Sequence, residues 1–401
     1  MKYGMRVKRV VSALVCGAAS VLVPGRLLQA QDDVAAMMAK VEAAQVPNRG
    51  GFDGLTLKQL MDAVGTPGVS IAIIKDFKIH WAKGYGVADA ESGTPVETNT
   101  VFQAASVSKP VTAMAAVRLV QEGRFSLDDD VNSLLKSWQV PKSAFTRDQP
   151  VTPRSLFSHS SGADDGFGFP GYEPSTPIPT VVQILNGEKP ANRGAVLFAR
   201  PPYQAFKYSG GGLTIMQLAM TDLTGMSFVE IMRKNVLEPL AMTNSSYQQP
   251  MSEAFAAHAA KAHNGSGKRV SAPWNIYPEL AAAGLWTTPS DLARFVIEIQ
   301  TAYRGPKGRV LSQASVREMI APIGVGPFAV GLTIEKRGEG WYFSHGGSNR
   351  GFRCEFMGHV RNGYGVVVMT NSDNGGIVVN EVRSRVAAAY GWDALDKPLI
   401  R

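Results

Sequence analysis

The sequence predicts an α+β fold of the α/β sandwich type, in which an antiparallel sheet of about five strands is flanked by helices and receives an inserted all-helical lobe. Two apolar runs near the amino end, 68–74 and 79–83, are separated by a short polar turn and indicate paired strands. Near the carboxyl end, further short apolar runs are divided by glycine-containing turns. The middle of the chain carries helical patches broken by loops rich in proline and glycine. Strands at both ends with helices between them indicate one sheet built from both ends of the chain.

The domain organisation follows from length and from the positions of these runs. At 401 residues the chain is longer than one compact core usually holds, so we expect two lobes. The sheet-bearing lobe is expected to comprise 31–126 and 273–401, and the helical lobe 127–272, together forming one composite domain. The later strands are expected at 328–335, 341–344, 351–358 and 364–370, and the terminal helices at 32–44 and 378–390.

The amino end has the layout of a secretory signal. Basic residues within positions 2–9 precede an apolar run, Val10–Val23, and Leu28-Gln29-Ala30 offers a small-residue cleavage site. The run is too short to span a bilayer. The sequence therefore predicts a signal peptide over 1–30, a mature chain beginning near Gln31 or Asp32, and a secreted or periplasmic protein without a stable membrane span. A retained amino-terminal anchor is the alternative.

Composition is that of an ordinary globular protein, with 45% hydrophobic and 18% charged residues. The formal net charge is +8, but five basic residues and no acidic ones lie in 1–30, so 36 basic residues face 33 acidic ones in the remainder. This near balance does not favour a nucleic-acid partner. Only Cys354 remains after cleavage, so no intrachain disulfide is expected.

The six histidines do not form a metal-binding pattern. No HExxH occurs, and His258 and His263 are five residues apart, which is off the spacing that places two ligands on one helix face. We therefore expect neither a metal nor another cofactor.

The stretch 103–121, QAASVSKPVTAMAAVRLVQ, places Ser106 and Lys109 directly before a proline and an apolar helix. Pro110 removes one backbone donor and crowds the carbonyl four residues back, so Ser106 is expected at the start of the helix. Residues three apart share a helix face, which puts the Ser106 hydroxyl within reach of the Lys109 amine. A serine becomes a nucleophile when a neighbouring base takes its proton. The alternative is a helix cap beside a solvated lysine.

The same spacing occurs a second time, in Ser133-Leu-Leu-Lys136. This copy follows Asp128-Asp-Asp on an expected surface helix, and we interpret it as coincidence. The four-residue spacing alone therefore does not identify an active site.

Two further stretches strengthen the case that Ser106 and Lys109 form an active site. Residues 207–212, KYSGGG, place Tyr208 before a glycine-rich turn that opens a helix. Residues 343–348, FSHGGS, end a predicted strand in His345 and two glycines, whose missing side chains let a ligand pair with the strand edge. Taken singly, Tyr208 is better explained as a core tyrosine with a satisfied hydroxyl, and His345 as a structural histidine at a strand end.

The three stretches, in this order, resemble the class C β-lactamase and penicillin-binding serine hydrolase family. The resemblance runs from about Val69 to Val386 and includes 156–162, LFSHSSG, and 284–293, GLWTTPSDLA. It implies a β-lactamase/transpeptidase-like fold. It also implies that Ser106 is the acylated nucleophile and Lys109 its proton acceptor, and that Tyr208 passes the proton to the leaving group and activates the deacylating water.

The resemblance further implies an oxyanion hole formed by the backbone amides of Ser106 and Ser348, with Gly346-Gly347 completing the strand motif. Two positions depart from the family pattern. Many members carry a lysine where His345 stands, and an asparagine that holds the substrate amide where Gly210 stands. Both changes remove groups that grip a β-lactam, which argues against efficient β-lactam hydrolysis and leaves acyl-serine chemistry intact.

The protonation of His345 bears on this chemistry. It is expected to be charged only below about pH 6.5 unless the site shifts its pKa, and a charged imidazolium would help to neutralise Lys109. His159 is expected to be a structural residue away from the pocket. The aromatic loop 164–172 is expected either to pack as a satellite cluster or to form a wall or lid of an acyl pocket.

The sequence thus predicts an exported serine hydrolase acting on a small ester, amide or peptidoglycan-type substrate. Carboxylic esters, D-amino-acid peptides and β-lactams stay open as substrate classes. The alternative from another class is a catalytically idle protein that binds penicillin or peptidoglycan fragments. A conventional Ser-His-Asp hydrolase is disfavoured because no G-x-S-x-G stretch occurs.

Overall fold

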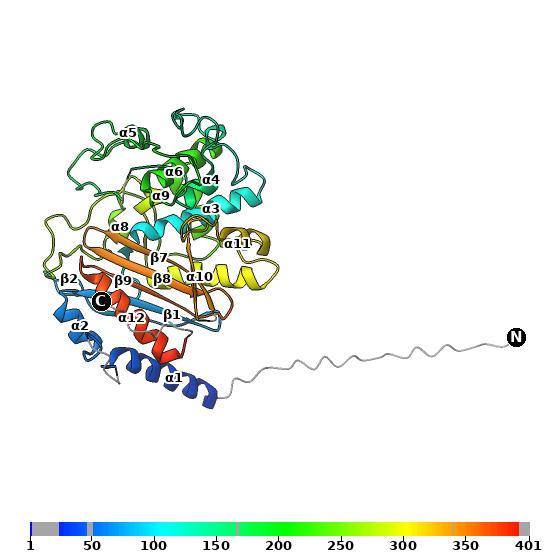
Figure 1. Ribbon diagram of the computed structural model, residues 1–401. Helices are drawn as coiled ribbons and strands as arrows, with labels where there is room; N and C mark the ends of the chain where they lie inside the picture. The colour runs from blue at the N-terminus through cyan, green and yellow to red at the C-terminus, as the bar shows by residue number, and fades with distance from the viewer. Residues whose placement is uncertain (2–23, 46–50, 166–167, 339, 393–401) are drawn as a thin grey trace.

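The computed structural model describes residues 1, 24–45, 51–165, 168–338 and 340–392. Its centre is an antiparallel sheet of seven strands in the order β3-β2-β1-β9-β8-β7-β6 (Figure 1). Because β1 pairs directly with β9, the sheet joins the two ends of the chain, as the sequence predicted. The strands are β1 (Gly68–Lys75), β2 (Lys78–Asp89), β3 (Thr94–Pro95), β6 (Thr333–Arg337), β7 (Gly340–Asn349), β8 (Phe352–His359) and β9 (Gly365–Thr370).

Three strand predictions need correction in detail. The sheet has seven strands and not about five, because all six runs expected along the chain join it and the short β3 adds an edge strand. β6 begins at Thr333, not at Phe328, because Gly331 has a φ of 79° and its neighbours fold onto α3. β7 continues to Asn349, well beyond the expected end at Ser344, and so carries the two glycines within the strand.

Helices cover both faces of the sheet. One face is covered by α1 (Pro24–Glu42), α2 (Leu57–Ala63) and α12 (Gly375–Tyr390), and the opposite face by α10 (Pro289–Arg304). Alternate residues of β1 therefore enter different cores: Val69 and Ile71 pack toward α12, and Ala72 packs toward the other side. This double burial explains why β1 is a continuous apolar run.

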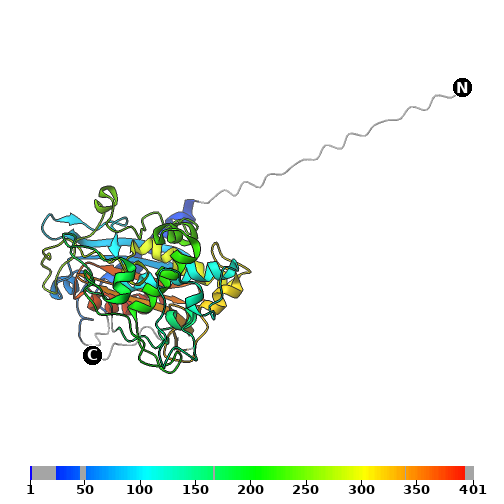
Figure 2. The same ribbon diagram turned by 90° about the horizontal axis from the view of Figure 1, so that it is seen from above.

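The helical region lies over the α10 side of the sheet, at one end of the molecule (Figures 1 and 2). Among the described residues between 127 and 272 there are helices and turns but no strand, and the predicted α+β class is confirmed. The exact lobe boundaries stay a prediction. The remaining elements are β4 (Phe102–Gln103), η1 (Ala105–Val107), α3 (Ser108–Gln121), η2 (Val131–Ser133), α4 (Pro153–Phe157), α5 (Val181–Asn186), α6 (Gly210–Thr224), α7 (Phe228–Met232), η3 (Arg233–Leu237), α8 (Glu253–Ala256), α9 (Leu280–Ala283), β5 (Trp286–Thr287) and α11 (Gln313–Met319).

The expected signal segment falls largely outside the described residues, which omit 2–23. The first helix was predicted over 32–44 and in the structure begins at Pro24, so the expected cleavage site lies within α1. Among the described residues, no helix combines the length and the apolar character that a membrane crossing requires. Cleavage and export stay predictions.

Candidate active site

The nucleophile candidate lies where β4 passes into α3. Ser106 occupies the single turn η1 immediately before α3, which agrees with the expected place at the start of a helix. The preceding Ala105 has a φ of 47°, in the left-handed region that alanine seldom adopts. Ser108 holds the turn, because its hydroxyl donates to the Ala105 carbonyl at 2.6 Å and accepts from the Leu285 amide at 2.9 Å. Backbone strain held by surrounding contacts in this way is common at functional sites.

Lys109 points from the first turn of α3 back to this serine. Its Nζ lies 3.0 Å from Ser106 Oγ and donates to the Ala282 carbonyl of α9 at 2.8 Å. The side chain is almost wholly buried. Burial lowers the pKa of the Lys109 amine from 10.5 to about 7, and the negative charge of Asp165 opposes part of that shift. The amine is therefore available as a base near neutral pH.

Tyr208 immediately precedes α6, which is capped by Ser209. Its hydroxyl shares a hydrogen bond with the Ser106 side chain, and Lys109 Nζ lies 5.0 Å from the centre of its ring. Burial raises the pKa of the Tyr208 phenol well above its usual range, with the Ser106 hydrogen bond opposing the shift. Tyr208 is therefore a neutral phenol that can give and receive a proton at physiological pH.

His159 was expected to be a structural residue away from the pocket; it does not line the pocket, but it lies directly behind Tyr208, which does. Its ring stacks on Tyr208 with centroids 4.1 Å apart, and its Nδ1 accepts from the Ser209 amide at 3.2 Å. Burial, and then the nearby Lys109, lower the pKa of His159 well below 6.5. His159 therefore supports the side chain of Tyr208, a member of the candidate site. The LFSHSSG stretch draws attention to His159, but the sequence does not show that it contacts Tyr208, which lies 49 residues further along the chain.

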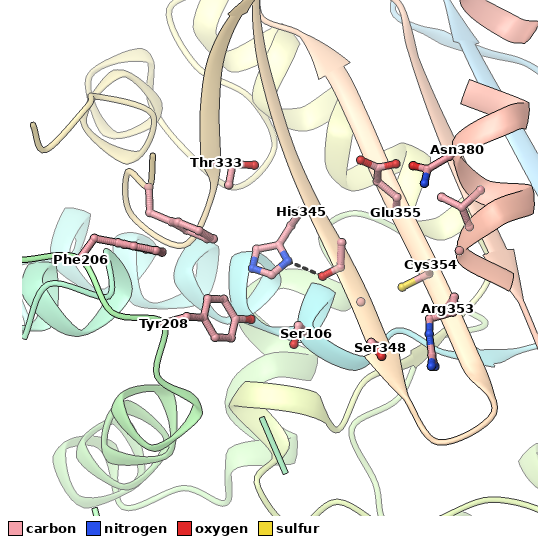
Figure 3. Close-up of a pocket in the computed structure, with 15 residues that line it drawn as sticks. Ser106, Phe206, Tyr208, Thr333, His345, Ser348, Arg353, Cys354, Glu355 and Asn380 are labelled. Atoms are coloured by element: carbon pink, nitrogen blue, oxygen red, sulfur yellow. Dashed lines mark hydrogen bonds between the residues drawn. The ribbon is translucent and has the colours of Figure 1, made fainter. Parts of the chain in front are cut away.

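His345 extends from β7 toward Tyr208, and the two ring centroids are 6.3 Å apart (Figure 3). Its Nδ1 donates to the Gly346 carbonyl at 2.6 Å, since a carbonyl can only accept. Burial, followed by the charge of Lys109, lowers the pKa of His345 to about 3. The imidazole is thus neutral at pH 7. The expectation that a charged His345 helps to neutralise Lys109 is corrected, because burial of the lysine itself has that effect.

Ser106, Tyr208 and His345 line one pocket of about 520 Å³. Figure 3 shows Ser106, Tyr208 and His345 facing the same space, with Ser348 beside the serine. β6 pairs with β7 only as far as Ser344, so in the described part of the chain the following residues of β7 have a strand neighbour on the β8 side alone. That open edge is where an extended substrate can form backbone hydrogen bonds.

The glycines of β7 are explained by close contacts. A Cβ on Gly347 would lie 2.3 Å from the Ala104 carbonyl oxygen and 2.6 Å from Cys354 Sγ, so a side chain cannot be accommodated there. A Cβ on Gly346 would meet little, which leaves the pocket floor open. The Cys354 thiol donates to the Ala104 carbonyl at 3.0 Å and is buried beneath the serine turn. The oxyanion roles of Ser106 and Ser348 stay a prediction.

The space beside Gly210 is occupied by the side chain of Phe169, a residue distant in the sequence. A Cβ at Gly210 would lie 2.6 Å from the ring of Phe169, so the ring occupies the space that a side chain at 210 would enter. Phe169 belongs to the aromatic loop 164–172 and packs against the main core. Phe206 and Phe328 also line the pocket, and the centroids of their stacked rings are 5.7 Å apart. No sequence motif pointed to Phe206 or Phe328 as part of the site.

The second Ser-x-x-Lys copy lies elsewhere. Ser133 and Lys136 are both exposed, and the Ser133 hydroxyl donates to the Asp130 carbonyl at 2.7 Å. Neither residue lines the pocket. Within the ranges that the structure describes, no group of three or more His, Cys, Asp or Glu side chains could hold a metal ion.

The fold and the site point to the serine hydrolases that use a serine and a lysine on one helix turn. Residues 54–390 match the model of the Beta-lactamase family, and the chain belongs to that family.

Individual relatives are more distant. The chain is 26% identical over 314 residues to protein flp of Staphylococcus aureus strain N315, covering 76% of this chain and 59% of that protein. It is 26% identical over 236 residues to teichoic acid D-alanine hydrolase of Staphylococcus aureus, covering 58% and 54%. The chain thus spans less than two thirds of the length of these curated relatives. Among solved structures, the D-amino acid amidase from Ochrobactrum anthropi SV3 is similar, with a TM-score of 0.66, 21% identity and coverage of 90% and 98%, a likeness that shows the fold.

Proposed function

We propose that this protein is an exported serine hydrolase that cleaves carboxylic ester or amide bonds through an acyl-enzyme at Ser106. The observation that carries the proposal is the buried Lys109 amine, 3.0 Å from Ser106 Oγ, with a pKa of about 7. An ordinary lysine has a pKa of about 10.4, and its neutralisation at pH 7 would cost about 4.6 kcal/mol. Burial removes most of that cost, so the base is ready at neutral pH.

In the acylation step, neutral Lys109 accepts the Ser106 proton while Oγ forms a bond to the acyl carbon. The carbonyl oxygen takes on negative charge, for which the backbone amides of Ser106 and Ser348 are the proposed donors. When the bond to the leaving group breaks, the Tyr208 hydroxyl donates its proton to that group and takes one back from the Lys109 ammonium. Ser106 is then acylated, and Lys109 and Tyr208 are again neutral.

Deacylation uses the same groups in reverse. A water molecule attacks the acyl carbon and loses its proton through Tyr208 to Lys109, and the bond to Ser106 Oγ breaks as that oxygen regains a proton. His159 holds the Tyr208 ring by stacking, which keeps the hydroxyl beside the serine through both steps. His345 contributes a neutral imidazole, and not a cation, to this cycle.

The site favours small esters over β-lactams. A β-lactam needs a hydrogen-bonding side chain for its amide and a positive charge for its carboxylate. Here Phe169 fills the space beside Gly210, and His345 is neutral at pH 7. Each missing charge-assisted or buried hydrogen bond costs about 1.5–3 kcal/mol, which is roughly ten- to a hundredfold in kcat/KM. Esters do not depend on these grips, because an alkoxide leaves without a demanding proton transfer to nitrogen.

A second candidate substrate is a D-alanyl compound of the cell envelope. It is favoured by the similarity to teichoic acid D-alanine hydrolase and by the fold shared with a D-amino acid amidase. The open edge of β7 beside Ser106 is suited to the backbone of a short D-alanyl substrate.

A substrate panel tests the proposal. We expect kcat/KM for nitrophenyl acetate or butyrate at pH 7.5 to exceed that for a chromogenic cephalosporin, with D-alanyl esters and peptides as the third arm. Efficient cephalosporin hydrolysis with esters left intact would contradict this account of the pocket. A protein that binds peptidoglycan fragments but turns over nothing and takes up no serine-directed probe would be the idle binding protein.

The Gly210 position gives a sharper version of the same test. Gly210→Asn alone should gain little cephalosporin activity, because the new side chain collides with Phe169. Gly210→Asn combined with Phe169→Ala should raise cephalosporin kcat/KM about tenfold or more over Phe169→Ala alone. An equal gain from the single Gly210→Asn variant would show that Phe169 does not occupy the amide position.

A further inference from the structure

Asp165 is the second residue of the aromatic loop 164–172, and its carboxylate binds the first turn of α6. Its Oδ2 accepts from the Gly211 amide at 2.7 Å, and its Oδ1 accepts from the Ser209 hydroxyl. The Ser209 oxygen in turn accepts from the Gly212 amide at 2.8 Å. A Cβ on Gly211 would lie 3.0 Å from the Asp165 carboxyl carbon and 2.4 Å from Val196, so the glycine permits this close approach.

The turn that Asp165 grips is the one that carries Tyr208. On its other side the same segment is held by His159, whose carbonyl accepts from the Lys207 amide at 2.8 Å and whose Nδ1 accepts from the Ser209 amide. Residues 207–211 are therefore fixed between His159 and Asp165. An acidic side chain at a helix amino end is also the favourable sign for the helix dipole.

Asp165 has a second effect because it is charged. The titratable groups that face Lys109 are Tyr208, His159 and His345, and all three are held neutral by burial. Among the described residues, Asp165 is the group whose charge acts on the Lys109 amine, and it favours the ammonium form. Lys109 becomes an ammonium when it takes the Ser106 proton, so a fixed anion on this side lowers the energy of that state.

We propose that Asp165 is a positioning residue that fixes the Tyr208 turn and supplies the negative charge opposite the ammonium that Lys109 becomes during acylation. This inference rests on the proposed function. It separates into a geometric part, carried by the two hydrogen bonds, and an electrostatic part, carried by the charge.

Two matched variants separate the charge from its surroundings. Asp165→Asn removes the anion with little change in size. Asp164→Asn removes an anion one residue earlier, where the exposed side chain pairs with Lys207. For a nitrophenyl ester, Asp165→Asn should move the acidic limb of the kcat/KM profile down by about 0.5–1 pH unit and lower the plateau about tenfold. Asp164→Asn should leave both within about twofold of the wild type.

Two further variants isolate the geometric part. Ser209→Ala removes the hydroxyl that donates to Asp165 and keeps the charge, so it should lower the plateau without moving the limb. Asp165→Glu keeps the charge, so its limb should stay at the wild-type pH even where the plateau falls. If Asp165→Asn does not fold, Ser209→Ala and Asp165→Glu carry the test. A shift of the acidic limb in Asp165→Glu as large as the one expected for loss of the charge, about 0.5–1 pH unit, would overturn the proposal.

The Lys109 titration can also be followed without turnover, by NMR of protein with isotope-labelled lysine. The expected midpoint is lower in Asp165→Asn than in the wild type and unchanged in Asp164→Asn. An unchanged midpoint in Asp165→Asn, with a loss of melting temperature alone, would overturn the proposal in favour of a simple helix cap. If the Lys109 midpoint falls in Asp165→Asn as expected but the wild type hydrolyses none of the substrates, the proposed function is contradicted and the electrostatic role of Asp165 is supported.

Discussion

The two Ser-x-x-Lys copies of this chain have the same spacing and opposite surroundings. Ser106 and Lys109 join at 3.0 Å in a buried turn, with a carbonyl of α9 as the second partner of the lysine. Ser133 and Lys136 lie exposed on the helical region, and the serine hydroxyl is satisfied by a local carbonyl. The difference teaches that spacing brings a base near a hydroxyl, while burial decides whether that base is neutral and able to act.

The largest expected effect comes from removing each lysine. Lys109→Ala should reduce ester kcat/KM by about 10²–10⁴-fold, because the proton acceptor for Ser106 is lost. Lys136→Ala should change it by less than about twofold. Steady-state kinetics on both purified variants checks this, and comparable losses in the two variants would mean that the buried environment of Lys109 is not what matters.

The pH profile should report the same burial. Because the neutral amine is the base and its pKa is about 7, activity should rise through about pH 7 and fall about tenfold for each unit below it. An unburied lysine would place that rise near pH 10. The measurement is kcat/KM for a nitrophenyl ester from pH 5 to 9, and a profile that is flat from 5 to 7 would be incompatible with Lys109 as the base.

The smallest expected effect on catalysis concerns Glu279, which tests whether burial alone makes a site. Its carboxyl group is fully buried at the start of α9, and no other residue of the described ranges donates a hydrogen bond to either oxygen. Burial raises the pKa of Glu279 to about 8, and a hydrogen bond from its own backbone amide opposes part of that shift. The folded state therefore keeps a proton that the unfolded state loses above about pH 4.5, so the free energy of unfolding falls as the pH rises toward 8.

Glu279→Gln removes this penalty, and should add up to about 3 kcal/mol to the free energy of unfolding at pH 7 and little at pH 4.5. Ester turnover should stay within about twofold. Denaturant unfolding at the two pH values is the measurement, and a variant that is destabilised at pH 7 would show that the carboxylate is ionised and held by a favourable contact.

Much of the fold could be predicted because its signals are local. The paired runs at 68–74 and 79–83, the turns near the carboxyl end and the helix after Pro110 are each recognisable from neighbouring residues. The start of β6 could not be predicted, since Phe328 to Thr333 is apolar enough for a strand and only the positive φ at Gly331 separates it. The length of β7 was missed because glycines usually weaken a strand.

The candidate site divides in the same way. The candidate residues stand in short motifs. The structure brings Ser106, Tyr208 and His345 to one pocket, and it buries Lys109 beside the serine. The contacts that position these side chains and shape the pocket join residues distant in the sequence. His159 stacks on Tyr208, and Phe169 packs beside Gly210. The neutral state of His345 follows from its burial, and burial is a property of the folded chain that no motif contains.

The central claim is that Ser106 is the nucleophile, and covalent labelling tests it most directly. A fluorescent serine-directed phosphonate should modify the wild-type protein at a single site, which peptide mass spectrometry should locate at Ser106. The label should disappear in Ser106→Ala, stay complete in Ser133→Ala, and form more slowly below pH 7 as Lys109 is protonated. A label that follows Ser133, or a folded wild-type protein that takes up none at pH 8, would contradict the account.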